Sequence, residues 1–243
     1  PKHYFKDSYD ADYENVEQTD IFLSSPPCQA FSLAGKRLGE LDKRGILFYE
    51  TYRFISVNQP KVFIIENVKG LLSAEKGTIF QNWIELLGRS VNGHEKMFIH
   101  EDSLEYNLHY TVLNSKNFGV PQNRERVFIV GIRKDLPNDF RFPIGWKLDK
   151  RLRDVLETNV EEKYYLSEKM LNTIMKPADG DWNSGKMQIN REISTSLSAT
   201  MHKMHRADTD NYVSDEIHKI GYVNQDTQAS QVYGVDGISP ILS

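Results

Sequence analysis

Cys28, the single cysteine of this 243-residue chain, lies in the stretch SSPPCQAFSLAGKR, residues 24–37. A thiol becomes a nucleophile once it is ionised. Pro26 and Pro27 directly precede Cys28 and hold it in a set direction, because the proline ring fixes φ. The alternative is an inert cysteine that is buried as a small hydrophobic residue. One cysteine excludes an internal disulfide framework and a zinc site built from several thiolates, and it favours a reducing compartment.

Two further segments carry polar side chains next to apolar runs. Glu66 follows the run VFII, and a carboxylate is an unusual residue to bury without a task. Gln122, Arg124 and Arg126 alternate along the segment QNRERV, so we expect them to point the same way and to suit an anionic or planar polar ligand. The alternatives are a structural salt bridge or helix contact for Glu66 and a charged, exposed strand edge for the other segment.

The elements that position these side chains alternate between strands and helices. Apolar runs of strand length predict strands at 19–25, 61–68, 110–114 and 126–132. Helical spacing predicts helices at 44–60 and 78–88. This alternation is typical of a doubly wound α/β fold, in which ligands bind outside the carboxyl ends of the strands. Cys28 lies just past the end of the first predicted strand and Glu66 lies at the end of the second, so both are expected at that edge.

The second predicted helix carries four apolar side chains at helical spacing, which are Phe80, Trp83, Ile84 and Leu87. We interpret them as core residues that need no ligand. Gly88 follows directly and is a candidate for the C-terminal cap of this helix.

The pattern changes from about residue 146, where the alternation of strands and helices stops. The segment 164–177 predicts one helix that begins at Ser167 and ends at Pro177. Beyond it the chain is rich in Ser, Thr, Asn, Gly and His and has few apolar runs. We therefore expect two domains, at 1–145 and 146–243.

The segments PPCQAFS, DKRGILFYE, ENV and QNRERV, in this order and at these separations, resemble blocks of the DNA cytosine carbon-5 methyltransferases of the restriction-modification or phage type. The resemblance covers roughly residues 1–156, and the remainder is similar only in style to the variable target-recognition region of the family. It implies a Rossmann-like α/β methyltransferase sheet, with 1–145 as the catalytic domain and 146–243 as a smaller, irregular target-recognition domain. The family's N-terminal Gly-rich cofactor block and its C-terminal blocks are not found, so we expect both domains to be partial and the sheet to be incomplete.

The resemblance also implies the reaction, which is methyl transfer from S-adenosylmethionine to carbon 5 of cytosine in a specific duplex DNA sequence. The product of the cofactor is S-adenosylhomocysteine, and no metal is expected. Cys28 matches the nucleophile that adds to carbon 6 of a flipped-out base. Glu66 matches the residue that protonates or hydrogen-bonds ring nitrogen 3. Arg126 matches the arginine that contacts the cytosine carbonyl oxygen, and Arg124 is similar to its neighbour in the active site.

Further residues are assigned by the same resemblance. The matches to cofactor-binding residues are Asp7, Pro27 and Leu47, and the expected substrate-binding residues are Gln29, Ser32, Asn67 and Gln122. Asn67 is expected to hold the turn that aims Glu66. Residues 32–45, with three glycines and four basic residues, resemble the mobile loop of the family, although an ordinary solvated connection would have a similar composition.

The expected partner is double-stranded DNA, and the full-length protein is expected to be monomeric in the cytoplasm of a bacterial or phage-infected cell. A net charge of −4 leaves room for a locally basic face. No apolar run approaches the roughly 20 residues that span a bilayer, so no membrane span is expected. Two alternatives stay open. A tRNA cytosine-5 methyltransferase would have a more compact recognition region, and a non-catalytic DNA-binding relative would be expected to have lost Cys28, Glu66 or Arg126.

Overall fold

A computed structural model of the chain describes residues 5–27, 47–157 and 189–197, with shorter pieces at 160–161, 165–167, 169, 210–214, 219–222, 231–233 and 238–240. The chain divides into two compact units. Unit 1 comprises Pro1–Leu113 and Glu125–Ile144, and unit 2 comprises Asn114–Arg124 and Gly145–Ser243. Unit 2 therefore includes a segment, 114–124, that a division at residue 145 assigns to the first domain. The functional assignment of the two domains stays a prediction.

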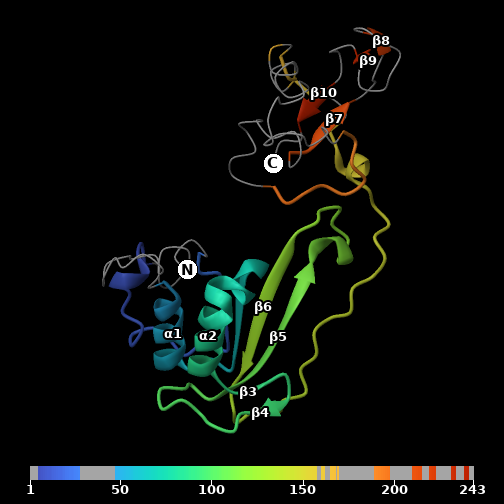
Figure 1. Cartoon of the computed structure of the whole chain (residues 1–243). Coiled ribbons are helices and arrows are strands. Elements are labelled where there is room, and N and C mark those ends of the chain that lie inside the picture. The colour runs from blue at the N-terminus through green and yellow to red at the C-terminus, as the bar shows by residue number, and fades with distance from the viewer. Residues whose placement is uncertain are drawn as a thin grey trace. The chain divides into compact units, whose positions relative to one another are not determined.

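The central element of unit 1 is a six-stranded sheet with the order β1-β2-β6-β5-β3-β4 (Figure 1). Its strands are β1 (Ile21–Ser24), β2 (Val62–Val68), β3 (Gly88–Val91), β4 (His94–Glu95), β5 (Tyr106–Asn114) and β6 (Glu125–Ile132). The pairs β1–β2 and β3–β5 are parallel, whereas β2–β6 and β3–β4 are antiparallel. All four strands that the sequence predicts are present. The short strands β3 and β4 are additional.

The register of the sheet brings three segments to one end. The pairing of β1 with β2 sets Ser24 opposite Ile65, so the chain leaves β1 beside Glu66. The antiparallel pairing of β2 with β6 sets Val68 opposite Arg126. The end of β2 therefore lies beside the start of β6. The reversed direction of β6 is what places an arginine from the start of a strand at the same edge as the residues that follow β1.

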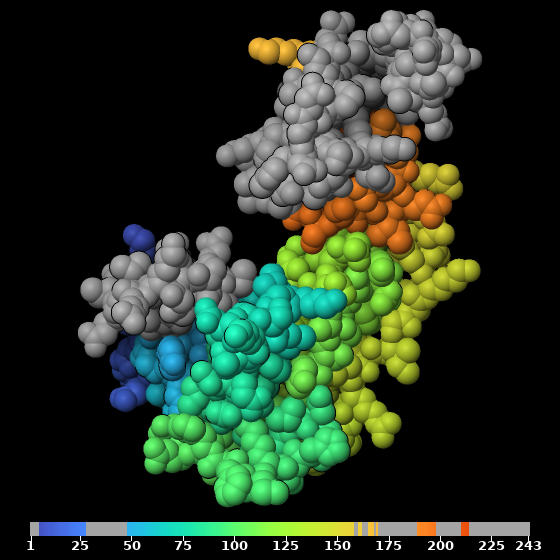
Figure 2. All heavy atoms as spheres, viewed as in Figure 1, coloured from blue at the N-terminus to red at the C-terminus, as the bar shows by residue number. Residues whose placement is uncertain are grey.

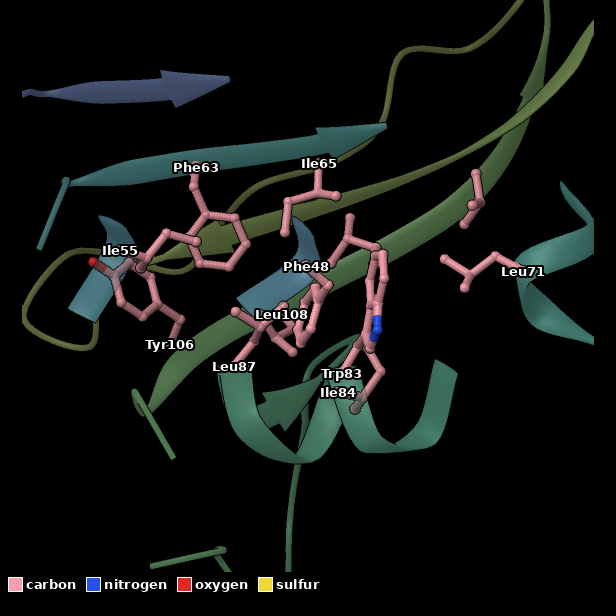
Figure 3. Packing of buried hydrophobic residues seen from close by; sticks show 12 residues of the cluster. Phe48, Ile55, Phe63, Ile65, Leu71, Trp83, Ile84, Leu87, Tyr106 and Leu108 are labelled. Atoms are coloured by element: carbon pink, nitrogen blue, oxygen red, sulfur yellow. The ribbon is translucent and has the colours of Figure 1, made fainter. Parts of the chain in front are cut away.

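Two helices, α1 (Leu47–Asn58) and α2 (Thr78–Leu87), pack on the same face of the sheet (Figure 1). Figure 2 shows the atoms of this region in the same view. Phe48 of α1 stacks on Trp83 of α2, with ring centroids 3.9 Å apart. Figure 3 shows Ile55 of α1 and Phe63 of β2 in the same buried layer. Trp83, Ile84 and Leu87 are buried and Phe80 is partly buried against them, as their spacing predicts. Within the described residues, no helix has the length and apolar character needed to cross a membrane.

Gly88 caps α2 as predicted, but its backbone is extended instead of left-handed. It is also the first residue of β3. A Cβ atom at this position would lie 2.3 Å from Leu108 Cδ1, so a larger residue would collide with the core. Glycine is therefore needed here for a close approach between β3 and β5, and not for a positive φ.

Short 3-10 helices connect the elements of unit 1, at η1 (Ser8–Asp10), η3 (Lys69–Leu72) and η4 (Ala74–Gly77). Unit 2 contains η5 (Ser115–Asn117) and η6 (Leu152–Val155). Its described strands form two antiparallel pairs, β7 (Tyr212–Ser214) with β10 (Ile238–Pro240) and β8 (Lys219–Tyr222) with β9 (Gln231–Tyr233). Most of the helix predicted at 164–177 lies outside the described residues.

Candidate active site

Glu66 and Arg126 form an ion pair at the edge where β2 ends. Alternate residues of β2 are buried, and Glu66 belongs to the other, half-buried set with Val68. Arg126 lies opposite Val68, so it is a diagonal neighbour of Glu66 on one face of the sheet. Its Nε atom donates to Glu66 Oε1 over 2.8 Å. The side chains of Arg126 and Glu66 are 20% and 28% exposed, so a ligand could still reach the pair.

The second carboxylate oxygen of Glu66 is also occupied. Ser25, the first residue after β1, donates from its Oγ atom to Glu66 Oε2 over 2.5 Å. Each oxygen of Glu66 therefore receives a hydrogen bond from a different strand end. Ser25 was not among the site residues predicted from the sequence, in which its signal is its position at the end of a predicted strand.

Asn67 ties the same two strand ends together. Its buried side chain donates from Nδ2 to the carbonyl oxygen of Pro26 over 2.8 Å and accepts from the backbone N–H of Val68. It thus anchors the turn that leads to Cys28, whereas Glu66 itself is held by Ser25 and Arg126. A contact between Asn67 and substrate stays a prediction.

Several expected site residues lie outside the described part of the chain. These are Cys28, Gln29 and Ser32, together with the loop 32–45. The description of this segment ends at Pro27, directly before Cys28. Glu66 and Arg126 are in contact, and the predicted approach of both to the Cys28 sulfur concerns an atom outside the described residues.

Gln122 and Arg124 belong to the segment that unit 2 contributes between β5 and β6. Asn114 holds this segment, because its Oδ1 accepts from the backbone N–H of Arg124 over 3.1 Å and its Nδ2 donates to Asn123 Oδ1 over 2.7 Å. The carbonyl oxygen of Gln122 accepts from Ser115 Oγ. Of the three residues predicted to form one row, Arg126 alone is part of β6. Gln122 and Arg124 precede it in the loop between β5 and β6.

A hollow of about 490 Å³ borders the segment that follows β1. Four aromatic residues line it, Phe5, Tyr13, Phe22 and Phe54. Phe22 is stacked on Phe54 at 4.2 Å and Tyr13 lies edge-on to Phe54 at 5.1 Å. Ser25 and Pro27 also line it, so Ser25 touches both the hollow and Glu66. The size and the aromatic lining are those of a site for a small organic ligand.

Charged groups border this hollow. Glu50 lines it and accepts from Arg53 over 2.7 Å, and the Arg53 guanidinium lies 4.2 Å from the centre of the Tyr13 ring. Burial, together with the Glu50 carboxylate, raises the pKa of Tyr13. The hydrogen bond to Glu50 raises the pKa of Arg53. Both pKa values move further above neutral pH, so Tyr13 stays uncharged and Arg53 stays charged, and the wall presents a neutral ring beside the Arg53–Glu50 ion pair.

The three residues matched to cofactor binding differ in position. Pro27 lines the hollow. Asp7 caps η1 by accepting from the backbone N–H of Tyr9 over 3.1 Å, and the next residue, Ser8, lines the hollow. Leu47 begins α1, and its side chain is not described. Tyr13, Phe22 and Phe54 were not predicted from the sequence, because their meeting depends on how the segment after η1 packs against β1 and α1.

Within the described residues, no group of three or more His, Cys, Asp or Glu side chains is arranged to hold a metal ion. The absence of a metal from the reaction stays a prediction.

The comparisons with known proteins agree with this architecture. The model of the family "C-5 cytosine-specific DNA methylase" matches residues 1–238. Among solved structures, the Entamoeba histolytica methyltransferase EhMeth is similar with a TM-score of 0.59 and 17% identity, over 90% of this chain and 63% of that one. This likeness confirms the predicted α/β methyltransferase sheet.

Two curated relatives support the family at the level of sequence. The Type II methyltransferase M1.ScrFI of Lactococcus lactis subsp. cremoris is 34% identical over 201 residues, which are 79% of this chain and 48% of the relative. The Type II methyltransferase M.HpaII of Haemophilus parainfluenzae is 41% identical over 162 residues, which are 66% of this chain and 42% of the relative. The chain thus spans about half the length of these relatives. By the match of its sequence to the family model over nearly its whole length, the chain belongs to the C-5 cytosine-specific DNA methylase family.

Proposed function

We propose that the complete protein transfers a methyl group from S-adenosylmethionine to carbon 5 of cytosine in a specific sequence of duplex DNA. One observation carries the proposal. The carboxyl group of Glu66 is fixed between Ser25 and Arg126 at the edge where the chain runs through Pro27 into Cys28. In the proposed reaction a single planar ring would meet Cys28 as nucleophile, Glu66 as proton carrier and Arg126 as cation, and the family membership of the chain supports this chemistry.

Cys28 is the proposed nucleophile. Carbon 5 of cytosine is a poor nucleophile, and addition of a thiolate to carbon 6 turns the ring into an enamine that can attack a methyl group through carbon 5. The thiol must lose its proton before or during the attack, so it needs electropositive surroundings. Arg126 contributes positive charge at this edge of the sheet.

Glu66 and Arg126 are the proposed partners of the ring. Addition at carbon 6 is easier when ring nitrogen 3 takes up a proton or a strong hydrogen bond, which the carboxyl group of Glu66 would supply. Arg126 would donate to the carbonyl oxygen of the ring, and Arg124 would lie beside it. Arginine suits this task because its guanidinium is always charged and presents several donors in one plane.

The hollow lined by Tyr13, Phe22 and Phe54 is the proposed cofactor site. When bound there, S-adenosylmethionine would supply the methyl group. The aromatic rings suit the flat adenine ring, and Pro27 joins the wall of the hollow to Cys28. The reaction closes when the proton on carbon 5 leaves to water or another base. Its electron pair re-forms the double bond between carbons 5 and 6, and the Cys28 thiolate departs with the electrons of the carbon–sulfur bond.

The target base must leave the DNA stack before Cys28 can reach it, at a cost of a few kcal/mol. We propose that residues 146–243 supply the recognition of the surrounding sequence, since the pattern of bases is readable in the major groove. We also propose that the protein acts in the cytoplasm of a bacterial or phage-infected cell.

Trapping with 5-fluorocytosine tests this proposal. The complete gene product is incubated with S-adenosylmethionine and with duplex DNA or tRNA in which 5-fluorocytosine replaces cytosine. Fluorine cannot leave as a cation, so the thiol adduct persists and is seen as a denaturant-resistant band that peptide mapping should assign to Cys28. We expect the adduct with DNA only. An adduct with tRNA only would contradict the proposal that DNA is the substrate. No adduct with either nucleic acid would indicate a non-catalytic relative.

A further inference from the structure

The Ser25 side chain contacts Glu66 and has no part in the proposed reaction. It is an exposed residue that follows β1 directly and precedes Cys28 by three positions. Its hydroxyl donates to Glu66 Oε2 over 2.5 Å, and Arg126 Nε donates to Glu66 Oε1 over 2.8 Å. Of these two donors, Ser25 is the one that comes from the segment leading to Cys28.

We infer that Ser25 is a positioning residue that holds the carboxyl group of Glu66 during the protonation of the base, and this inference rests on the proposed function. Pro26 and Pro27 limit the backbone between Ser25 and Cys28, because their rings fix φ. The orientation of the Glu66 carboxyl group is therefore linked to the segment that carries the nucleophile.

The hydroxyl group suits this task because it can reverse its role. A serine hydroxyl donates to a carboxylate and accepts from a protonated carboxyl group, whereas a guanidinium can only donate. When Glu66 takes up the proton that it passes to ring nitrogen 3, Arg126 cannot accept a hydrogen bond from the new O–H group, because a guanidinium has no acceptor. Ser25 can turn its O–H bond and keep its hydrogen bond in both protonation states. It keeps its own proton, so the proton moves only between Glu66 and the ring.

The turn around Ser25 has a separate anchor. Asn67 Nδ2 binds the carbonyl oxygen of Pro26 over 2.8 Å, and this bond does not involve the Ser25 side chain. Removal of the hydroxyl alone should therefore leave the turn in place. The loss of one hydrogen bond to a charged group corresponds to a rate decrease of roughly 10- to 100-fold.

The test compares Ser25→Ala, Ser25→Thr and the control Ser103→Ala in the complete gene product. Ser103 accepts from the backbone N–H of Glu105 just before β5, away from Glu66. For each protein, the rate of adduct formation with 5-fluorocytosine DNA, kcat and KM with cytosine DNA and the midpoint of thermal unfolding are measured. The wild-type protein is measured first.

We expect Ser25→Ala to lower the rate of adduct formation and kcat roughly 10- to 100-fold, with unchanged KM and unfolding midpoint. Ser25→Thr, which keeps the hydroxyl, should recover most of the rate, and Ser103→Ala should equal the wild type. An active wild type with an equally active Ser25→Ala variant overturns this inference and leaves the proposed function intact. Equal losses in the alanine and threonine variants, or a loss expressed in KM or in the unfolding midpoint, also overturn it. A wild type that forms no adduct overturns both proposals.

Discussion

Two ion pairs lie at the same end of β2 and β6 and differ in their surroundings. Each contains one of two consecutive residues of β6, Glu125 and Arg126. Arg126 pairs with Glu66 over 2.8 Å, and Glu125 pairs with Lys69 over 3.0 Å. The side chains of the first pair are 20% and 28% exposed, and those of Glu125 and Lys69 are 43% and 55% exposed. Consecutive residues of a strand point to opposite faces, so the two pairs face different environments.

The difference shows that distance alone does not make a site. An exposed pair gains little, because water and salt screen it and its long side chains lose entropy on pairing. Lys69 Nζ reaches both oxygens of Glu125, whereas two separate donors, Ser25 and Arg126, each hold one oxygen of Glu66. A group fixed in this way needs little reorganisation when a ligand arrives. Variants on the two faces should therefore separate effects on chemistry from effects on stability.

Replacement of the nucleophile has the largest expected effect. Cys28→Ser should abolish methyl transfer and leave DNA binding largely intact, because only the covalent step is lost. Transfer of a radiolabelled methyl group measures the first, and a gel-shift titration measures the second. Substantial turnover by the serine variant would contradict the assignment of Cys28 as the nucleophile and, with it, the assignment of the reaction to the face of Glu66.

The comparison of the two carboxylates comes next. Glu66→Gln should lower kcat by roughly 10²- to 10⁴-fold, because an amide cannot carry the proton for ring nitrogen 3. Glu125→Gln is the matched control, since it makes the same change at the same strand end on the other face. Its kcat should equal that of the wild type. Equal losses in the two variants would contradict the assignment of the chemistry to one face.

The opposite end of β2 provides a contrast in stability. The buried Tyr106 hydroxyl donates to the carbonyl oxygen of Pro60 over 2.7 Å, and burial raises the pKa of Tyr106 to about 12 from its ordinary value of 10.0. Tyr106→Phe should lower the free energy of unfolding by about 1–3 kcal/mol, because a buried carbonyl loses its partner. The kcat of the folded enzyme should not change.

This contrast depends on pH in a defined direction. Because the pKa of Tyr106 is higher in the folded state, its protonated hydroxyl stabilises the fold fully below pH 10. This stabilisation is lost as the pH rises to about 12. The advantage of the wild type over Tyr106→Phe should therefore shrink between pH 10 and 12. Urea denaturation of both proteins at several pH values measures it. An advantage that stays constant across this range would show that the hydroxyl does not titrate as its burial requires.

The smallest effect is expected at the exposed pair. A double-mutant cycle of Lys69→Met and Glu125→Gln should give a coupling of less than about 1 kcal/mol, and the coupling should fall further at high salt. Urea denaturation at low and high salt measures it. A larger, salt-independent coupling would show that the two pairs are more alike than their exposure indicates.

The sequence by itself determined the local elements and the candidates for chemistry. Apolar periodicity is a property of neighbouring residues, so it predicted β1, β2, β5 and β6, the two helices and the buried face of α2. It did not predict β3 and β4, because these strands are short and lack a continuous apolar run. The placement of polar residues at strand ends pointed to Glu66 and Arg126 for the same local reason.

Tertiary structure alone decided which of these side chains meet. The antiparallel register of β6 brings Arg126 to Glu66, whereas Arg124, two residues earlier, belongs to unit 2. The hydrogen bond from Ser25 to Glu66 joins residues 41 positions apart, and the hollow between Tyr13, Phe22 and Phe54 joins three separate segments of the chain. Such contacts depend on strand pairing and helix packing between distant segments, and no local pattern of residue types encodes the register in which those segments close.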